Sequence, residues 1–172
     1  GTWTVIQSTD VPTGKGFANS FRVDCTTADA SPAAGDFCIV STRLEGQDVQ
    51  LFKKGTSSAE KFTLSFYVKS NKTGTFIAEL DDNDNSRNIN QTYTISSANT
   101  WEKKVLTFDA DTTGVFDNDN ASSLQILWWL DGGSNFRSGS LQTAWGSTDN
   151  TKRLAGSEAL GDSTDNDWSI TG

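Results

Sequence analysis

The stretch KFTLSFYVKSNKTGTFIAEL, residues 61–80, decides the fold class of this chain. In its first half, phenylalanine, leucine and valine alternate with polar or amphipathic residues, which is the period of a strand with one buried face. After the turn-forming run SNKTG the alternation resumes as far as Leu80. We therefore predict two strands joined in a hairpin with one apolar face.

The same alternation recurs along the rest of the chain. Further strands are predicted at residues 3–6, 19–25, 37–43, 89–95, 101–108, 124–130 and 168–171, with a less regular one at 49–52. Short, turn-rich connectors between about eight or nine strands are typical of a two-sheet sandwich. We predict an all-β, two-sheet antiparallel jelly-roll sandwich that forms a single domain over residues 1–172. Because the chain ends inside the last strand pattern, we expect it to be a segment of a longer polypeptide.

The composition is acidic and rich in turn-forming residues. There are 22 Asp and Glu against 14 Lys and Arg, which gives a net charge of -8. An acidic surface without a basic cluster repels phosphate backbones, so we expect no nucleic-acid partner. The longest strongly apolar run, residues 126–130, is too short to cross a bilayer, and we expect no membrane partner.

The chain contains no histidine, which excludes Ser-His-Asp and Cys-His catalysis and every histidine-ligated metal site. A glycosidase needs only two carboxyl groups, so acidic residues alone leave that chemistry open. Glu79 and Glu102 are the glutamates on predicted strands, and their simplest interpretation is as solvated strand residues.

Two Asp/Asn-rich tracts, residues 81–85 and 117–120, raise the question of calcium, which prefers oxygen ligands. The first tract does not fit an EF-hand loop, because Ser86 stands at the glycine position and Thr92 at the final glutamate position. Turn formation explains both tracts. We predict no cofactor, and calcium held by scattered loop oxygens stays open.

Cys25 and Cys38 flank a short loop between two predicted strands. If those strands pair as antiparallel neighbours, the two thiols come within bonding distance and a disulfide is possible. The alternative is that both are small buried residues.

Several large side chains are predicted on the faces of strands that point away from the core. In LQILWWL, residues 124–130, alternation places Gln125 and Trp129 opposite the core-facing residues. Tyr67, Ile77 and Glu79 point outward from the 61–80 strands in the same way. If these strands share a sheet, their flat rings and polar groups form a shallow surface suited to sugars.

Residues 131–167 interrupt the strand pattern with a long run rich in Gly, Ser, Asn and Thr. A segment of this length is either functional or folded back over the sandwich, where it would cover the outward residues. It contributes three further candidates. The predicted ligand-binding residues are Tyr67, Glu79, Gln125, Trp129, Phe136, Arg137 and Trp145.

The phrases FTLSFYVKSNKTGTF, TYTISSANTWEKKVLTF, DCTTADASPAAGDF, FDNDNASSLQILWWLDGGSNF and WSITG together cover most of the chain. On these phrases the sequence resembles jelly-roll modules in tail-fibre and other virion proteins of bacteriophages, many of them marine. More distantly, the order of its strands is similar to carbohydrate-binding modules of polysaccharide-degrading enzymes. The resemblance implies a jelly roll that binds rather than cleaves, and no catalytic residue carries over.

These observations lead to one functional prediction and two alternatives. The prediction is a non-enzymatic virion surface or tail-fibre module, located on the virion or otherwise extracellular, that binds host-surface glycan. The first alternative is a structural domain that contacts neighbouring virion subunits or a second copy of itself. The second is a carbohydrate-binding module of a secreted polysaccharide-degrading enzyme.

Overall fold

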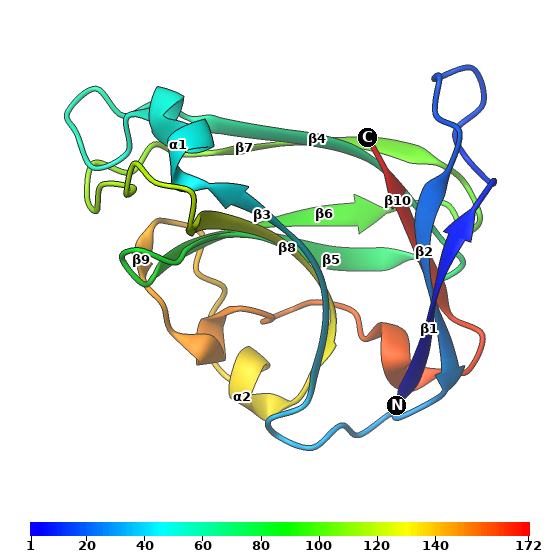
Figure 1. The fold of residues 1–172 in the computed structure, drawn as a ribbon. Helices are drawn as coiled ribbons and strands as arrows, with labels where there is room; N and C mark the ends of the chain where they lie inside the picture. The colour runs from blue at the N-terminus through cyan, green and yellow to red at the C-terminus, as the bar shows by residue number, and fades with distance from the viewer.

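A computed structural model describes residues 1–172 and contains two antiparallel sheets of five strands each (Figure 1). Sheet I consists, in spatial order, of β1 (Thr2–Ser8), β2 (Ser20–Thr27), β10 (Asp167–Thr171), β4 (Phe62–Ser70) and β7 (Glu102–Phe108). Sheet II consists of β3 (Phe37–Glu45), β8 (Ser122–Gly132), β5 (Gly74–Asp82), β6 (Arg87–Ile95) and β9 (Gly146–Ser147). The predicted all-β, two-sheet antiparallel sandwich is confirmed.

The path of the chain between the sheets is that of a jelly roll. Six connections carry the chain across to the other sheet: β2 to β3, β3 to β4, β4 to β5, β6 to β7, β7 to β8 and β9 to β10. The β5–β6 connection, by contrast, is a hairpin within sheet II, as its acidic tip predicts. These crossovers bring β2, near the start of the chain, and β10, at its end, together as neighbours in sheet I.

The predicted hairpin within residues 61–80 is wrong, although both of its strands are present. β4 pairs with β10 and β7 in sheet I, whereas β5 pairs with β6 and β8 in sheet II. The turn between them is bonded to the chain before β10: Asn71 Nδ2 donates to the Asp165 carbonyl at 2.8 Å, and Asn71 Oδ1 accepts from the Asp167 N–H at 2.9 Å. Alternation identifies a strand, but it does not identify the partner.

The main core lies between the sheets, where the inward-facing side chains of β4, β5, β6, β8 and β10 meet. Val68, Phe76, Leu130 and Trp168 are fully buried. The indole N–H of Trp168 donates to the Tyr93 hydroxyl at 3.1 Å, so these two polar groups of the core satisfy each other.

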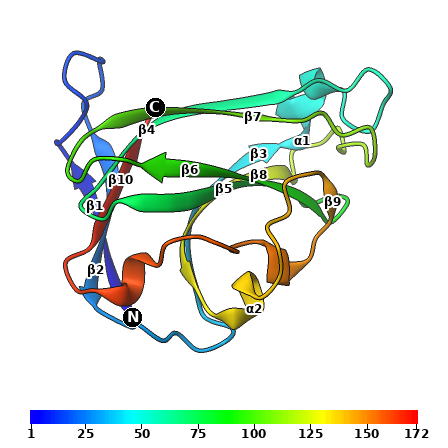
Figure 2. The same cartoon turned by 180° about the vertical axis from the view of Figure 1, so that it is seen from behind.

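Residues 131–167 fold back over the outer face of sheet II (Figures 1 and 2). This segment contains α2 (Ser134–Arg137), β9, and the 3-10 turns η2 (Asn150–Lys152) and η3 (Leu160–Asp162). It buries Ile77 and Trp129 under Leu154 in a second apolar cluster. The covering arrangement, one of the two alternatives for this segment, is therefore the observed one.

Two smaller predictions are corrected. The irregular strand at residues 49–52 is helical, with α1 (Gly46–Val49) followed by the 3-10 turn η1 (Gln50–Phe52). Cys25 and Cys38 are free thiols, because β2 and β3 belong to different sheets and do not pair. Burial raises the pKa of the Cys38 thiol to about 12, which keeps it protonated.

Candidate functional site

The structure does not bring the seven predicted ligand-binding residues together in one place. Glu79 and Trp129 lie on the outer face of sheet II with 0% and 2% of their surface exposed, and Phe136 packs on Trp129 with 5.3 Å between ring centroids. Tyr67 lies on the outer face of sheet I, where its ring meets Phe17 edge-on. The condition for one continuous surface, a shared sheet, is met for β5 and β8 in sheet II but not for β4, which carries Tyr67 in sheet I.

The other three candidates make contacts within the protein. The side-chain oxygen of Gln125 accepts a hydrogen bond from the Arg43 guanidinium at 3.0 Å. Arg137 Nε donates to the Gly132 carbonyl at 2.8 Å. Trp145 Nε1 donates to the carbonyl of Asp109 at 2.7 Å, far along the chain from α2. A ligand-binding role for these seven residues stays a prediction.

Glu79 is at the centre of a buried ionic cluster that fastens the covering segment to sheet II. Its carboxylate accepts from Trp129 Nε1 at 2.7 Å and from Arg153 Nε at 3.1 Å, and it forms a second, closer contact with the same guanidinium. Arg153 also bonds Asp81 at 2.9 Å and lies over the Trp129 ring at 5.2 Å. Burial raises the pKa of Glu79 to about 7, although Arg153 opposes the shift. All four residues of this cluster, Glu79, Asp81, Trp129 and Arg153, bond to one another and hold the covering segment on sheet II. We call this cluster the latch.

The two Asp/Asn-rich tracts also bond to the protein. Asp82 pairs with Lys54 at 2.5 Å, and Asp84 accepts from the Asp117 backbone N–H at 2.9 Å. No group of three or more acidic or cysteine side chains is arranged to hold a metal ion. Calcium binding through scattered loop oxygens stays open, and these tracts do not form a cofactor site.

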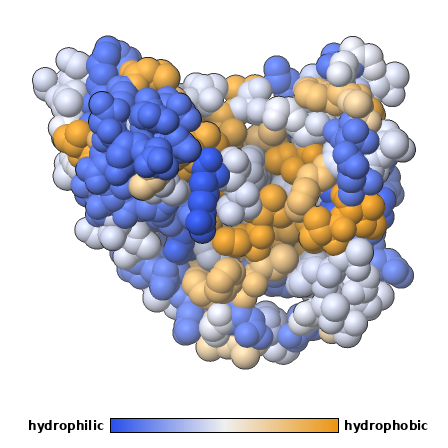
Figure 3. All heavy atoms as spheres, viewed as in Figure 1, coloured by the Kyte–Doolittle hydropathy of each residue, from blue (hydrophilic) through white to orange (hydrophobic).

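The open surface of the molecule lies where the sheets diverge at their β1 and β3 edges. Trp3 and Val5 pair with Cys25 and Val23, so they belong to the inner face of sheet I. Val5 is nevertheless 61% exposed, because sheet II does not reach over it. The result is an apolar groove of about 510 Å³ between β1, β2 and β10 on one side and β3 and β8 on the other. Figure 3 shows an apolar surface in this hollow, beside a hydrophilic lobe on the left of the view.

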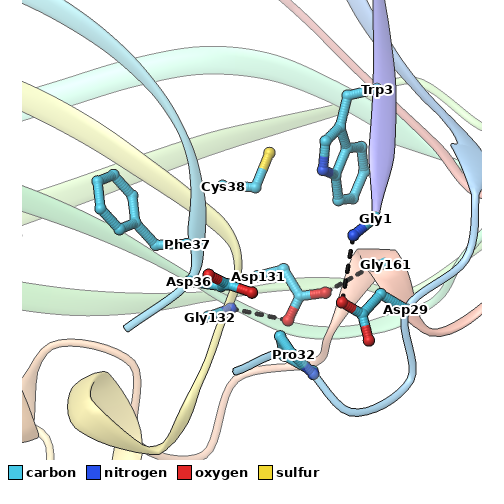
Figure 4. Close-up of a pocket in the computed structure, with 10 residues that line it drawn as sticks. All are labelled: Gly1, Trp3, Asp29, Pro32, Asp36, Phe37, Cys38, Asp131, Gly132 and Gly161. Atoms are coloured by element: carbon cyan, nitrogen blue, oxygen red, sulfur yellow. Dashed lines mark hydrogen bonds and ion pairs between the residues drawn. The ribbon is translucent and has the colours of Figure 1, made fainter. Parts of the chain in front are cut away.

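A smaller pocket of about 300 Å³ continues the groove at the β3 end, and Trp3 and Cys38 line both (Figure 4). Aspartates 29, 36 and 131 line this pocket, and no lysine or arginine does. Asp36 is solvent-exposed, and the Phe37 ring beside it is 57% exposed. The pocket thus combines an accessible aromatic ring with carboxylate hydrogen-bond acceptors.

Asp131 is the most deeply placed acid of the pocket. Its two carboxylate oxygens accept from the N–H groups of Gly132 at 2.7 Å and Gly161 at 2.9 Å. Burial raises the pKa of its carboxyl group. A Cβ on Gly161 would lie 2.3 Å from Asp131 Oδ2, so only glycine lets the backbone approach this carboxylate.

None of these pocket residues was among the candidates from the sequence. Asp36 and Phe37 lie in a loop and at a strand start, and Asp131 was part of the irregular segment. Trp3 was predicted only as part of a short first strand, residues 3–6. The position of this tryptophan on the first strand was the available signal. The exposure of such a side chain depends on whether the second sheet covers it, which the sequence does not show.

Comparison with known proteins identifies a solved structure of similar fold. No family model matches the chain, and no curated protein matches it. The chain is similar to the enzymatically active domain of tailspike protein 4 of bacteriophage CBA120, with a TM-score of 0.50 and 16% sequence identity. The match covers 98% of this chain but only 17% of the tailspike chain. It shows that the two share a fold.

This match corrects one prediction. We expected a non-enzymatic module, but the solved chain that it resembles is described as an enzymatically active domain. The predicted similarity to carbohydrate-binding modules receives no support from the comparisons. No helix of the structure is long and apolar enough to span a membrane.

Proposed function

We propose that this chain is a β-sandwich module of a bacteriophage tail-associated polypeptide and that its groove and pocket bind host-surface carbohydrate. The observation that carries the proposal is the pocket formed by Trp3, Asp36, Phe37 and Asp131, which continues an open apolar groove. The shared fold with a bacteriophage tailspike domain supports the tail association.

The chemistry of the pocket suits a sugar polymer. A pyranose ring presents an apolar face, which stacks on an exposed aromatic ring such as Phe37, and hydroxyl groups, which donate to carboxylates such as Asp36. The two volumes lie within or near the range of about 300–1,000 Å³ typical of small-molecule sites. Three aspartates line the pocket against a single cation, the N-terminal ammonium of Gly1 paired with Asp29 at 3.2 Å, so neutral or amine-bearing sugars fit better than sulfated or carboxylated ones.

The proposal is tested by calorimetry against a panel of bacterial surface polysaccharides. We expect at least one neutral glycan to bind, and Phe37→Ala to weaken that binding about tenfold through lost stacking. Asp36→Asn should weaken it as well. Val115→Ala is the matched control, since Val115 is 58% exposed and lies outside the groove. Absence of binding to every glycan, or equal binding by both pocket variants and the wild type, would overturn the proposal.

A second candidate function is hydrolysis of the bound glycan in the same pocket. It is favoured by the enzymatic description of the solved structure and by Asp131, whose carboxyl pKa is raised by burial and which lines the same cavity as Asp36. The glycan that binds is incubated with the protein and assayed for new reducing ends. Release that disappears in Asp131→Asn supports hydrolysis, and binding without release limits the pocket to recognition.

A further inference from the structure

Lys54 is buried at the end of the sandwich remote from the groove, in the loop that follows η1. Its side chain is 0% exposed, as is that of Asp82 at the end of β5, and Asp111 in the β7–β8 connection is 4% exposed. Lys54 Nζ lies 2.5 Å from Asp82 Oδ2 and 3.2 Å from Asp111 Oδ2. An amine, a carboxyl group and a second carboxyl group are thus in contact in a site closed to solvent.

Aromatic rings enclose this site. The ring centroids of Phe116 and Trp145 each lie 5.1 Å from Lys54 Nζ. The backbone carbonyls of Thr113 and Gly114 accept from the same nitrogen at 3.0 and 2.8 Å, which holds it in place. Two full charges are costly in such surroundings, and moving one proton from the nitrogen to a carboxylate leaves a neutral amine and a carboxylic acid.

The two aspartates are held differently. Asp82 Oδ1 accepts from the backbone N–H of Asn85 at 3.1 Å and from Asn85 Nδ2 at 3.2 Å, and the same Nδ2 lies 3.0 Å from Oδ2. Donors therefore reach the oxygen Oδ1, on which negative charge can develop, as well as Oδ2. Asp111 is bound by Arg87 through Nε at 2.8 Å and Nη2 at 3.0 Å. Burial by itself raises the pKa of Asp111, but the Arg87 guanidinium and further donors hold it below its usual value. Asp111 is therefore an anion, and its Oδ2 lies 3.2 Å from Lys54 Nζ, within reach of a proton on that nitrogen.

We propose that Lys54 and Asp82 condense within the folded chain to an amide bond. Asp111 accepts a proton from Lys54 Nζ, and the freed electron pair attacks the Asp82 carboxyl carbon. The C–N bond forms, the C–Oδ2 bond breaks, and the Asn85 donors stabilise the charge on Oδ1. Of the three ammonium protons, one stays on the amide nitrogen and two leave with Oδ2 as water, one of them returned by Asp111. No oxidant, metal or cofactor is needed.

Proximity lowers the barrier to this step. In water, amine and carboxylate do not condense, whereas groups fixed in contact react with effective molarities of about 10⁵–10⁸ M. Lys61 and Asp109 provide an internal comparison: they form an ion pair of 2.8 Å, but their side chains are 65% and 73% exposed. We expect that exposed pair to remain an ordinary salt bridge.

The test is the intact mass of the purified full chain, followed by tryptic mapping. We expect a mass lower than that of the sequence by one water molecule, no cleavage after Lys54, and a branched peptide that joins residues 54–61 to residues 73–87. The full sequence mass overturns the proposal. So does a loss of water that maps to a single peptide, since that is cyclisation of an aspartate and not a cross-link.

Variants separate the roles of the residues without relying on activity. Asp111→Asn keeps the size of the side chain but cannot accept the proton, so we expect it to fold and to show the full mass. Lys61→Arg is the matched control and should keep the loss of water. If Asp111→Asn forms the cross-link as fast and as completely as the wild type, the role of Asp111 is overturned. Because the site lies outside the groove, this result and that of the carbohydrate test are independent of each other.

Discussion

The outer face of sheet II and the groove between β1 and β3 both present apolar strand residues, but only one of them is covered. Residues 131–167 cover Ile77 and Trp129, with Leu154 packed on them and Arg153 latched to Glu79. Nothing in the chain covers Val5, although it lies on the inner face of its sheet. The inward or outward direction of a side chain therefore does not determine its exposure. What covers the face determines it.

The largest effect is expected at the latch. Arg153→Ala leaves the Glu79 carboxylate buried without its cation, and removing one partner of a buried pair costs about 3–5 kcal/mol. The loss should be greater above neutral pH than in mild acid, where Glu79 takes up a proton. Chemical denaturation at two pH values measures it. The control is Lys152→Ala, which removes an exposed pair with Asp149 and should cost less than about 1 kcal/mol. Equal effects of the two variants would contradict the latch.

A similar but smaller effect is expected for the apolar part of the cover. Leu154 is fully buried, so Leu154→Ala should lower the free energy of unfolding by about 3 kcal/mol, within the usual range of about 2–5 for a truncated core leucine. Leu51→Ala is the matched control, because Leu51 is 66% exposed and its truncation should change stability by less than about 0.5 kcal/mol. A cover that contributes little to stability would show similar values for both.

The pH dependence of stability tests the burial of Glu79 directly. The pKa of Glu79 rises from 4.5 to about 7 on folding, so the folded state holds this proton more tightly than the unfolded state does. The resulting stabilisation is complete below pH 4.5 and is lost as the pH rises through about 7. Relative to Glu79→Gln, the wild type should therefore lose about 2 kcal/mol between about pH 5 and about pH 8. Parallel curves for the two proteins would show that Glu79 does not titrate in this range.

The smallest effect is expected in the groove. Val5→Ser removes an exposed apolar side chain that sheet II does not cover, so the free energy of unfolding should change by less than about 0.5 kcal/mol. Ile77→Ser, on the covered face, provides the contrast and should be strongly destabilising, because it places an unsatisfied hydroxyl group in an apolar site. A large loss for Val5→Ser would mean that the groove is closed in solution.

Much of the fold was predictable from local sequence patterns. The alternation in residues 61–80 correctly identified β4 and β5, and the acidic turn at residues 81–85 correctly predicted the β5–β6 hairpin. The pairing of β4 with β5 was wrong, because each strand finds its partners through contacts distant in sequence. The disulfide failed for the same reason, since Cys25 and Cys38 are near in sequence but belong to different sheets.

The candidate site was much less predictable. Trp129 and Glu79 were correctly placed on the outward face of their strands, but that face is the seat of the latch. Asp36, Phe37 and Asp131 converge on one pocket from loops and strand ends, and no periodic pattern marks such positions. The Lys54 site is similar, because Lys54 and Asp111 come from two connections distant in sequence and Asp82 from the end of β5.

The sequence by itself determined that this chain forms strands, where most of them lie and that they build a two-sheet sandwich. These properties follow from side-chain period and turn chemistry, which act over a few residues. Only the tertiary structure decided which strands pair, which apolar face is covered and which acids share a cavity. Those outcomes depend on competition for burial among segments distant in the chain. Local periodicity reflects only neighbouring residues and so cannot predict which segment wins.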